Sequence, residues 1–428
     1  MKIAMFTNTY LPHVGGVARS VKTLEDGCRA QGHEVCVVAP EFEGAEESSN
    51  VLRVPAIQNF NGSDFCVRLP VPNLIRDFME DFHPDIIHSH HPFLLGDAAL
   101  REAWKMNIPI VFTHHTLYES YTHYVPFDSP ALKRVAIQMA TEYCNLCDLV
   151  IAPSESLEKL LKDRKVVTPV RVIPTGVDTD TFDHGDGVGF RETHGIPPSA
   201  KVIGHVGRLA KEKNLIFMAE AVALCLEAEP DAVFLVVGEG DAQQEMTEIL
   251  RSFVESSRVY FTGNLSGDDL VDSYAAIDCF VFSSQTETQG LVLAEAMAAG
   301  TPVVAIDGPG VRDILEDGTN GVLLESEAST GEYAKAIRTL LHDEPLMHSY
   351  GRRARKSAGE YDTARCVKTM LQTYQHLVGK NRRGRDEDPT RWDRVRSGIE
   401  IEWELFNARV HAASAAMMKT PASEVGLD

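Results

Sequence analysis

Short apolar segments of strand length alternate with longer amphipathic segments along most of this 428-residue chain. The first series of apolar segments reads KIAMFT, EVCVVAP, DIIHSH, PIVFTHH, LVIAPS and VRVIP. Residues 17–31, after the first of them, carry apolar or small residues at helical spacing and end at Gly32, a helix stop signal. This alternation predicts βαβ units built on a parallel sheet.

A second series begins at KVIGHVGR and continues through AVFLVVGEG, VYFTGNL, CFVFSS, TPVVAI and GVLLES. Between the two series, residues 174–190 combine Pro, Gly and Asp without periodicity, which indicates a domain boundary. We therefore expect an α/β fold of two doubly wound, Rossmann-like domains, residues 1–180 and 181–360. The carboxyl ends of both sheets are expected to face a shared cleft, where ligands of such folds bind.

The C-terminal part of the chain follows the second series. Residues 361–380 are predicted to form a helix that returns to the N-terminal domain, and residues 381–428 form a charged tail. Apolar residues recur at helical spacing in the tail, which fits an amphipathic helix. The tail could dock on a partner or a membrane surface, or it could pack on the chain's own domains.

The composition narrows the range of functions. The chain has 62 acidic and 41 basic side chains and a formal charge of -21, which argues against DNA or RNA as its main partner. Neither a signal peptide nor an apolar run of about 18 residues is present, so we expect a cytoplasmic protein.

The eight cysteines are scattered. The CxxC at Cys144 and Cys147 lacks further ligands, so buried thiols are favoured over a redox or metal site.

Two segments that follow strands and open helices could contact phosphate. VGRLAKEKN lacks the P-loop pattern, and HVGGVARS lacks the GxGxxG pattern of a dinucleotide fold. The backbone amides of Gly15 and Gly16 and the side chains of Arg208 and Lys213 could nevertheless contact a diphosphate. For the two cations, a solvated helix start is an equally compatible interpretation.

Two carboxylates stand eight residues apart in SSQTETQGLVLAEAMAAGTPVVA. The neighbours of Glu295 are apolar or small on every face, which predicts a largely buried helix. Because a buried carboxylate needs partners, Glu295 suits a pair of ribose hydroxyls, each of which can donate a hydrogen bond to it. Glu287, in the turn before this helix, offers a second acceptor to a sugar.

The segments VGRLAKEKN, SSQTETQGLVLAEAMAAGTPVVA and TNTYLPHVGGVARSV together resemble the retaining glycosyltransferases of family four, which have the GT-B fold. The resemblance covers about residues 1–380, and its Glu-x7-Glu signature with the downstream AxxxGxPVV is fairly specific. It implies this donor-binding set: Gly15, Gly16, Arg208, Lys213, Glu287, Thr288, Gln289, Gly290 and Glu295. By the same resemblance, Glu295 holds the nucleotide ribose and Glu287 contacts the donor sugar. Gln289 is a departure, because many members carry an aromatic residue there.

The implied reaction is transfer of a sugar from a nucleotide diphosphate with retention at the anomeric carbon. Fixed cations at Arg208 and Lys213 would stabilise the charge that develops on the leaving diphosphate. Glu287 and His115 complete the implied catalytic set, since His115 matches the histidine that lines the reacting sugar; His114 competes for that assignment. The nucleotide sugar, UDP-glucose or a similar compound, is a substrate, and no cofactor is expected.

A metal site is not expected either. The DTD at residues 178–180 is similar to the metal-binding DxD of another glycosyltransferase fold, but it lies in the linker between the domains, where a turn explains it. Five histidines end two neighbouring strands without an accompanying acid, and lining of the cleft explains them better than zinc binding. They are His88, His90, His91, His114 and His115.

The acceptor region is predicted to follow His115. Tyr118, Tyr121 and Tyr124 stand three residues apart and would share a helical face, which fits core packing or contact with an apolar acceptor. Residues 116–130 resemble the acceptor region of enzymes that glucosylate diacylglycerol. This implies transfer to a lipid such as diacylglycerol, with peripheral contact at the inner face of the membrane.

Three alternatives stay open at this stage. The acceptor could be a soluble sugar or small molecule, or the chain could be a non-catalytic module that binds sugar nucleotides. The four intact donor contacts Arg208, Lys213, Glu287 and Glu295 argue against the module. A sugar-nucleotide epimerase could share the fold, but the Glu-x7-Glu signature disfavours it.

Overall fold

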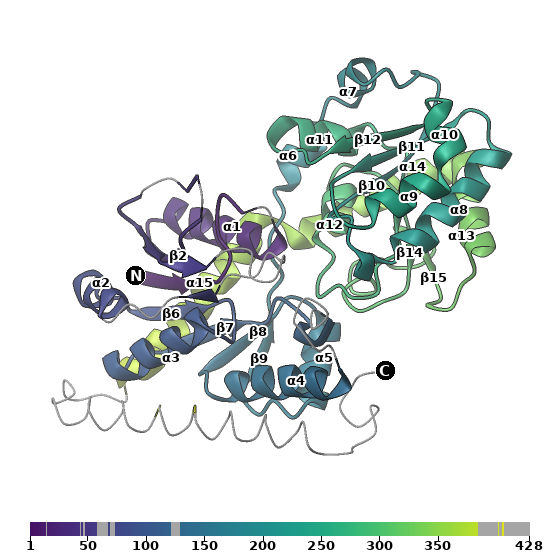
Figure 1. Cartoon of the computed structure of the whole chain (residues 1–428). Coiled ribbons are helices and arrows are strands. Elements are labelled where there is room, and N and C mark those ends of the chain that lie inside the picture. Colours follow the sequence, from purple (N-terminus) through teal and green to yellow (C-terminus); the bar gives the residue numbers. More distant parts are fainter. Residues whose placement is uncertain are drawn as a thin grey trace. The chain divides into compact units, whose positions relative to one another are not determined.

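The computed structural model describes residues 1–13, 15–42, 44–45, 48–57, 67–68, 73–120 and 129–383, together with Ile401 and Leu405. Contacts divide the chain into a first unit, Met1–Gly176 with Cys366–Asp428, and a second unit, Val177–Arg365. Each unit has its own parallel sheet with helices packed on it (Figure 1). The predicted α/β fold with two Rossmann-like sheets is confirmed.

The sheet of the first unit has seven parallel strands in the order β3-β2-β1-β6-β7-β8-β9. They are β1 (Lys2–Phe6), β2 (Glu34–Pro40), β3 (Val51–Val54), β6 (Ile86–Ser89), β7 (Ile110–Thr113), β8 (Leu149–Ala152) and β9 (Val170–Val172). Strands β4 (Ala56–Ile57) and β5 (Val67–Arg68) form a separate antiparallel pair. The chain runs outward from β1 to β3 and then returns to β6 on the other side of β1. The topological switch point therefore lies between β1 and β6.

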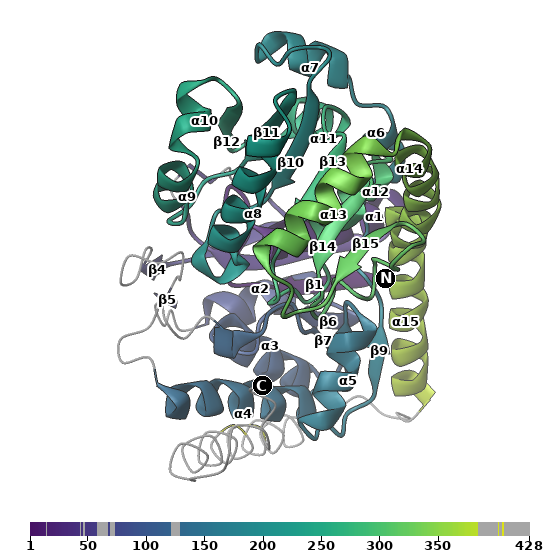
Figure 2. The same ribbon diagram turned by 90° about the vertical axis from the view of Figure 1, so that its right-hand side faces the viewer.

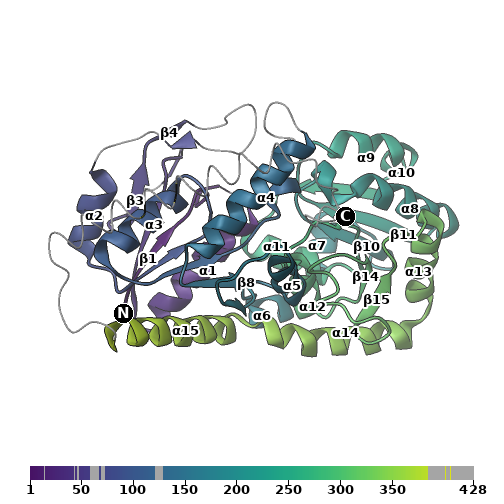
Figure 3. The same cartoon turned by 90° about the horizontal axis from the view of Figure 1, so that it is seen from below.

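Both faces of this sheet are buried, because alternate side chains of each strand point to opposite faces. Ile3 and Met5 belong to a cluster with residues of α1 and α15, whereas Ala4 and Phe6 belong to a cluster with residues of α2, α3, α4 and α5. Figure 3 shows α3 and α4 in front of the strands. The helices are α1 (Gly16–Ala30), α2 (Leu74–Phe82), α3 (Leu95–Met106), α4 (Pro130–Asn145), α5 (Glu155–Asp163) and α15 (Thr363–Arg383).

Two residues of the C-terminal tail are described. Ile401 and Leu405 stand four residues apart and are buried in the same cluster as Ala4 and Phe6. These two side chains therefore pack on the first unit of their own chain. The other residues beyond 383, including the tail tryptophans, lie outside the described residues.

The sheet of the second unit has six parallel strands in the order β12-β11-β10-β13-β14-β15. They are β10 (Lys201–Val206), β11 (Ala232–Val237), β12 (Val259–Gly263), β13 (Cys279–Phe282), β14 (Val303–Ile306) and β15 (Gly321–Leu324). The topology repeats that of the first unit, so the switch point lies between β10 and β13.

Helices cover both faces of the second sheet as well. Residues of α8 and α13 share one buried cluster, and Figure 2 shows these two helices side by side in front of the strands. Residues of α6, α7, α11, α12 and α14 share the cluster on the opposite face. The longer helices are α8 (Leu215–Ala228), α11 (Gly267–Ala275), α12 (Leu291–Ala298), α13 (Thr330–His342) and α14 (Glu344–Ala358). The shorter ones are α6 (Thr179–Asp183), α7 (Gly187–Thr193), α9 (Gln243–Ile249), α10 (Arg251–Glu255) and the 3₁₀ turns Lys211–Lys213 and Gly359–Tyr361.

Two expectations from composition can be compared with the structure. The cysteines in the described ranges are buried free thiols, as predicted. Burial raises the pKa of both Cys144 and Cys147, which keeps these thiols protonated. Within the described ranges, no helix is both long enough and apolar enough to cross a membrane.

Candidate functional site

The switch point of the second sheet brings two sequence-predicted residues together. Lys213 ends the 3₁₀ turn after β10, and Glu287 lies in the loop after β13. Because β10 and β13 are parallel neighbours, both loops leave the same edge of the sheet. The Nζ atom of Lys213 lies 2.5 Å from Oε1 of Glu287, and these side chains are 17% and 18% exposed. The hydroxyl of Ser283 ties the loops together by donating to the carbonyl oxygens of Lys213 and Asn214, at 3.1 and 2.9 Å.

The environment of Glu287 keeps its carboxylate charged. Burial alone would raise the pKa of Glu287, but the neighbouring Lys213 and hydrogen bonds from Lys213 and Ser284 bring this pKa below its usual value. His205 of β10 contributes in the same direction. Glu287 can therefore accept hydrogen bonds at neutral pH, but it cannot act there as an acid.

Arg208 follows β10 directly and forms an ion pair with Glu212 in the same segment. The Arg208 side chain is 40% exposed, whereas that of Glu212 is 7% exposed. The buried carboxylate therefore fixes one end of a guanidinium that still reaches the surface. A solvated helix start, the alternative interpretation of the two cations, therefore does not describe Lys213, whose side chain is largely enclosed, whereas Arg208 is partly exposed.

The loop between Glu287 and α12 packs tightly. Gly290 has φ +75° at the start of α12, a conformation that favours glycine. A Cβ atom on Gly310 would lie 2.7 Å from the backbone nitrogen of Gln289, so the backbone at Thr288 and Gln289 packs closely against this glycine. The Gln289 side chain is itself 5% exposed. Gln289, which stands where many family members carry an aromatic residue, is thus a buried polar side chain.

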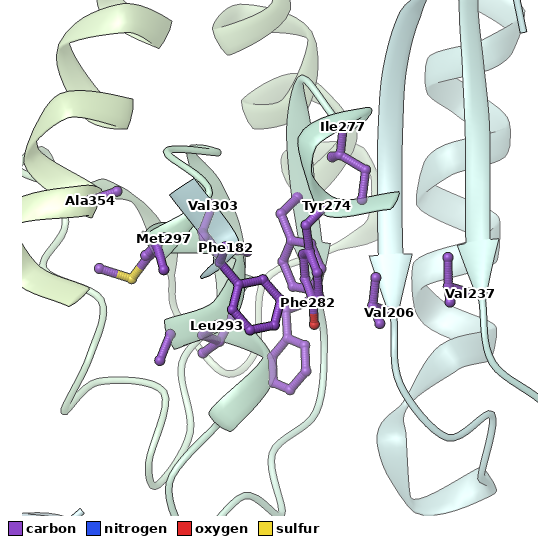
Figure 4. Packing of buried hydrophobic residues seen from close by; sticks show 14 of the residues in the cluster. Phe182, Val206, Val237, Tyr274, Ile277, Phe282, Leu293, Met297, Val303 and Ala354 are labelled. Atoms are coloured by element: carbon purple, nitrogen blue, oxygen red, sulfur yellow. The ribbon is translucent and has the colours of Figure 1, made fainter. Parts of the chain in front are cut away.

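Glu295 lies in α12 and is 1% exposed, which confirms its predicted burial. The hydroxyl of Tyr274 donates a hydrogen bond of 2.6 Å to Oε2 of Glu295. Tyr274 is fully buried and packs with Phe182, Phe280 and neighbouring apolar residues (Figure 4). The hydroxyl of Tyr274 therefore orients the carboxylate of Glu295 beside this apolar cluster.

Replacing Tyr274 by Phe is expected to destabilise the second unit by about 1–3 kcal/mol, because the buried carboxylate of Glu295 loses a donor. The shift of the urea-unfolding midpoint of Tyr274→Phe measures this effect. Tyr260→Phe is the matched control, since the Tyr260 hydroxyl makes only an exposed 3.3 Å bond to the carbonyl of Gly195. Equal shifts for the two variants would contradict the importance of the Tyr274 bond.

In the first unit, the loop after β1 leads into α1. Gly15 precedes α1 in extended conformation, and no side chain caps the helix start. The amides of the first turn of a helix lack partners within the helix, so the segment at Gly15 and Gly16 offers donors to an anion. Tyr10 donates to the buried carboxylate of Glu25 in α1, which ties the loop to this helix.

Five histidines lie at the carboxyl ends of β6 and β7 or just after them. The expectation that they line a cleft is wrong for His88, His90 and His114, which are at most 1% exposed. The Nδ1 atom of His88 lies 2.5 Å from the hydroxyl of Tyr374, and its Nε2 atom lies 2.7 Å from Oγ1 of Thr113. The ring of His90 lies against that of His88, with centroids 4.0 Å apart. Nδ1 of His90 lies 2.9 Å from Nε2 of His115.

The two adjacent candidates His114 and His115 differ in exposure. His114 is 1% exposed, and its ring packs edge-on against Phe112 and Tyr118. His115 is only partly buried. His115 therefore offers a surface to a ligand, whereas His114 packs in the interior beside Tyr118. Tyr121 and Tyr124 lie outside the described residues.

Acid is expected to destabilise the first unit well above the pH at which its carboxylates titrate. Burial lowers the pKa of His88, His91 and His114 to about 3. The unfolded chain takes up these protons as pH falls below about 6.5, so stability is full above this pH and is lost below it. At pH 5 each histidine costs about 2 kcal/mol. Thermal unfolding between pH 7 and 5 tests this, and a melting temperature that stays constant over this range would contradict it.

The alternative metal sites receive no support. No group of three or more His, Cys, Asp or Glu residues in the described ranges is placed to hold a metal ion. Asp178 of the DTD segment caps the short helix α6, with its carboxylate accepting from the backbone nitrogen of Thr181 at 3.1 Å. The segment is thus a helix start and not the expected turn.

Sequence reasoning missed three residues of these assemblies. They are Glu212, which pairs with Arg208 in the same segment, and Tyr274 and His205, which only the fold brings near Glu295 and Glu287. The stretch KEKN in the motif around Arg208 did carry a signal for Glu212, because a carboxylate four residues after an arginine can pair with it.

Comparisons with known proteins agree with this architecture. The model of Glycosyltransferase Family 4 matches residues 14–181, and that of Glycosyl transferases group 1 matches residues 189–357. The chain is 30% identical to an alpha-monoglucosyldiacylglycerol synthase of Streptococcus pneumoniae over 357 residues, 82% of this chain and 80% of that protein. It is 28% identical to a GDP-mannose-dependent alpha-mannosyltransferase of Corynebacterium glutamicum over 335 residues, 76% of this chain and 77% of that protein.

Among solved structures, the sucrose-phosphate synthase of Thermosynechococcus elongatus superimposes with a TM-score of 0.72 at 20% identity, covering 89% of this chain and 99% of that one. This likeness supports the fold. The family matches cover both units and include the segments that carry Arg208, Lys213, Glu287 and Glu295. The chain therefore belongs to glycosyltransferase family 4: it is a hexosyltransferase with the two Rossmann-like domains of the GT-B fold.

Proposed function

We propose that this enzyme transfers glucose from UDP-glucose to diacylglycerol with retention at the anomeric carbon. The observation that carries the donor half of the proposal is the pairing of Lys213 with Glu287 at the switch point of the second sheet, where open α/β sheets bind ligands. Arg208 lies in the same segment after β10 as Lys213. The name of the Streptococcus pneumoniae relative supports the acceptor half.

In this mechanism the cations act on the leaving group. An ammonium has three N–H donors, so Lys213 can hold Glu287 and a phosphate oxygen at the same time. Arg208 would bind the diphosphate with its exposed end while Glu212 holds the other. Because negative charge on the diphosphate increases as the glycosidic bond breaks, both cations stabilise the transition state more than the ground state. No metal and no cofactor takes part.

The remaining residues would hold the rest of the donor. Glu287, charged at neutral pH, accepts hydrogen bonds from sugar hydroxyls, and the buried carboxylate of Glu295 accepts from the ribose. Amides at Gly15 and Gly16 add donors for the phosphates. His115 lines the transferred sugar. Thr288, Gln289 and Gly290 complete the donor set that the resemblance implies.

For the acceptor we propose a lipid, with Tyr118, Tyr121 and Tyr124 contributing apolar contacts. Such an enzyme would be cytoplasmic and would bind the inner face of the membrane peripherally. The formal charge of -21 disfavours strongly anionic bilayers, so neutral vesicles are the appropriate first test surface.

Release of nucleoside diphosphate tests the proposal. The full-length protein is incubated with UDP-glucose or GDP-mannose, with phosphatidylcholine vesicles that contain or lack diacylglycerol. We expect UDP release that requires both UDP-glucose and diacylglycerol. Release of GDP from GDP-mannose would overturn the donor assignment. GDP-mannose is included because one relative is a GDP-mannose-dependent mannosyltransferase. Release only with soluble acceptors would overturn the lipid assignment.

A further inference from the structure

The bond between His90 and His115 joins the segments that follow two neighbouring strands of the first sheet. His90 follows β6, and His115 follows the parallel neighbour β7. Their ring nitrogens lie 2.9 Å apart, which is hydrogen-bond distance. Burial lowers the pKa of both histidines well below the usual value. Both rings are therefore neutral at neutral pH, and a single proton lies between the two nitrogens.

The surroundings of His90 indicate which of the two nitrogens is protonated. Nε2 of His90 is buried and makes no hydrogen bond with a group in the described ranges. A buried N–H without an acceptor is rarer in proteins than a buried acceptor without a donor. His90 therefore carries its proton on Nδ1 and donates it to Nε2 of His115. A neutral His115 then carries its own proton on Nδ1.

His90 is itself fixed by its neighbours. It is 1% exposed, and the ring of His88 lies against it. His88 is bonded on both nitrogens, to Tyr374 of α15 and to Thr113 of β7. The ring of His90 thus has one orientation, and its Nδ1 edge faces His115.

We propose that His90 is a positioning residue for His115, which fixes both the ring orientation and the tautomer of that histidine. This inference rests on the proposed function, in which His115 lines the transferred sugar. With Nε2 of His115 engaged by His90, the proton of a neutral His115 lies on Nδ1. The proposed role of His90 is to hold the ring of His115 in this state beside the transferred sugar.

Two substitutions of His90 separate positioning from packing. In His90→Asn the side-chain amide nitrogen takes about the place of Nδ1 and can still donate to His115, whereas His90→Leu cannot. We expect His90→Leu to lower kcat by about 10-fold or more, because a misplaced catalytic contact has effects of this size, and to change the KM for UDP-glucose by less than about 2-fold. His90→Asn is expected to recover most of the lost kcat. Equal losses in both variants, or no loss in His90→Leu, would overturn the inference.

A double-mutant cycle shows whether His90 acts through His115. Adding His90→Leu to His115→Ala is expected to cause no further loss of kcat, and independent, multiplying effects would count against the inference. If the wild-type protein turns over UDP-glucose but the two substitutions lower kcat independently, the inference about His90 is refuted and the proposed function is not. Wild-type protein that turns over no sugar nucleotide refutes the proposed function instead.

Nitrogen NMR of histidine-labelled protein provides a readout that needs no turnover. We expect the wild-type protein to show a protonated Nδ1 and a bare, hydrogen-bonded Nε2 on His115. This pattern should persist in His90→Asn and be lost in His90→Leu. A protonated Nε2 on His115 in the wild-type protein would overturn the assigned tautomer and the proposal with it.

Discussion

Arg208→Ala is expected to lower kcat by about 100-fold or more, while the protein stays folded. The Arg208 side chain is 40% exposed, so its removal leaves no large cavity. Its guanidinium would stabilise the charge on the departing diphosphate, an interaction that grows toward the transition state. Steady-state kinetics with UDP-glucose at saturating diacylglycerol measure the effect.

The matched control for this variant is Arg338→Ala. Arg338 of α13 is 44% exposed and pairs with Glu229, whose side chain is 11% exposed and also bonds His342. Arg208 has a similar exposure and likewise pairs with a largely buried glutamate, Glu212. It lies outside the donor set, so its replacement should leave kcat within about 2-fold. If Arg208→Ala behaved like Arg338→Ala, the role of Arg208 in leaving-group stabilisation would be refuted.

Glu295→Ala is expected to weaken the binding of both UDP-glucose and UDP by about 10- to 100-fold. Hydrogen bonds to a charged acceptor are worth about 1.5–3 kcal/mol, and the ribose is common to both ligands. Isothermal titration with each ligand measures the loss. Because Glu295 is 1% exposed and holds Tyr274, the alanine variant also loses stability, so Glu295→Gln is titrated beside it.

The glutamine variant keeps an acceptor for the Tyr274 hydroxyl and loses only the charge. We expect it to bind UDP more weakly than the wild type and more tightly than the alanine variant. Glu102→Gln, a change of a buried glutamate in α3 of the first unit, is the control and should bind UDP normally. Binding of UDP unchanged in both Glu295 variants would remove this residue from the donor site.

The sheets were predictable from the sequence because strands that are buried on both faces consist of continuous apolar runs, such as KIAMF and AVFLVV. The burial of Glu295 was predictable for the same reason, since every neighbour in its helix is apolar or small. In both cases the signal is local, so that a short window of sequence contains the physical cause.

The pairings inside the site were not predictable in this way. Lys213 and Glu287 are 74 residues apart and meet because β10 and β13 are neighbours in the sheet. Nothing near Tyr274 in the sequence distinguishes it from a core tyrosine, and its role follows from the position of its hydroxyl beside Glu295. The bonds of His88 to Tyr374 and of His90 to His115 likewise depend on contacts that a sequence pattern does not encode.

The linkage in the product tests the central claim most directly. Full-length protein, UDP-glucose and phosphatidylcholine vesicles with diacylglycerol are incubated, and the extracted lipid is analysed by mass spectrometry and proton NMR. Because the donor sugar is α-linked to UDP, a retaining glucosyltransferase must give a monoglucosyl diacylglycerol with an α anomeric proton. A β-linked glycolipid, or glucose recovered free or on soluble acceptors alone, would contradict the account.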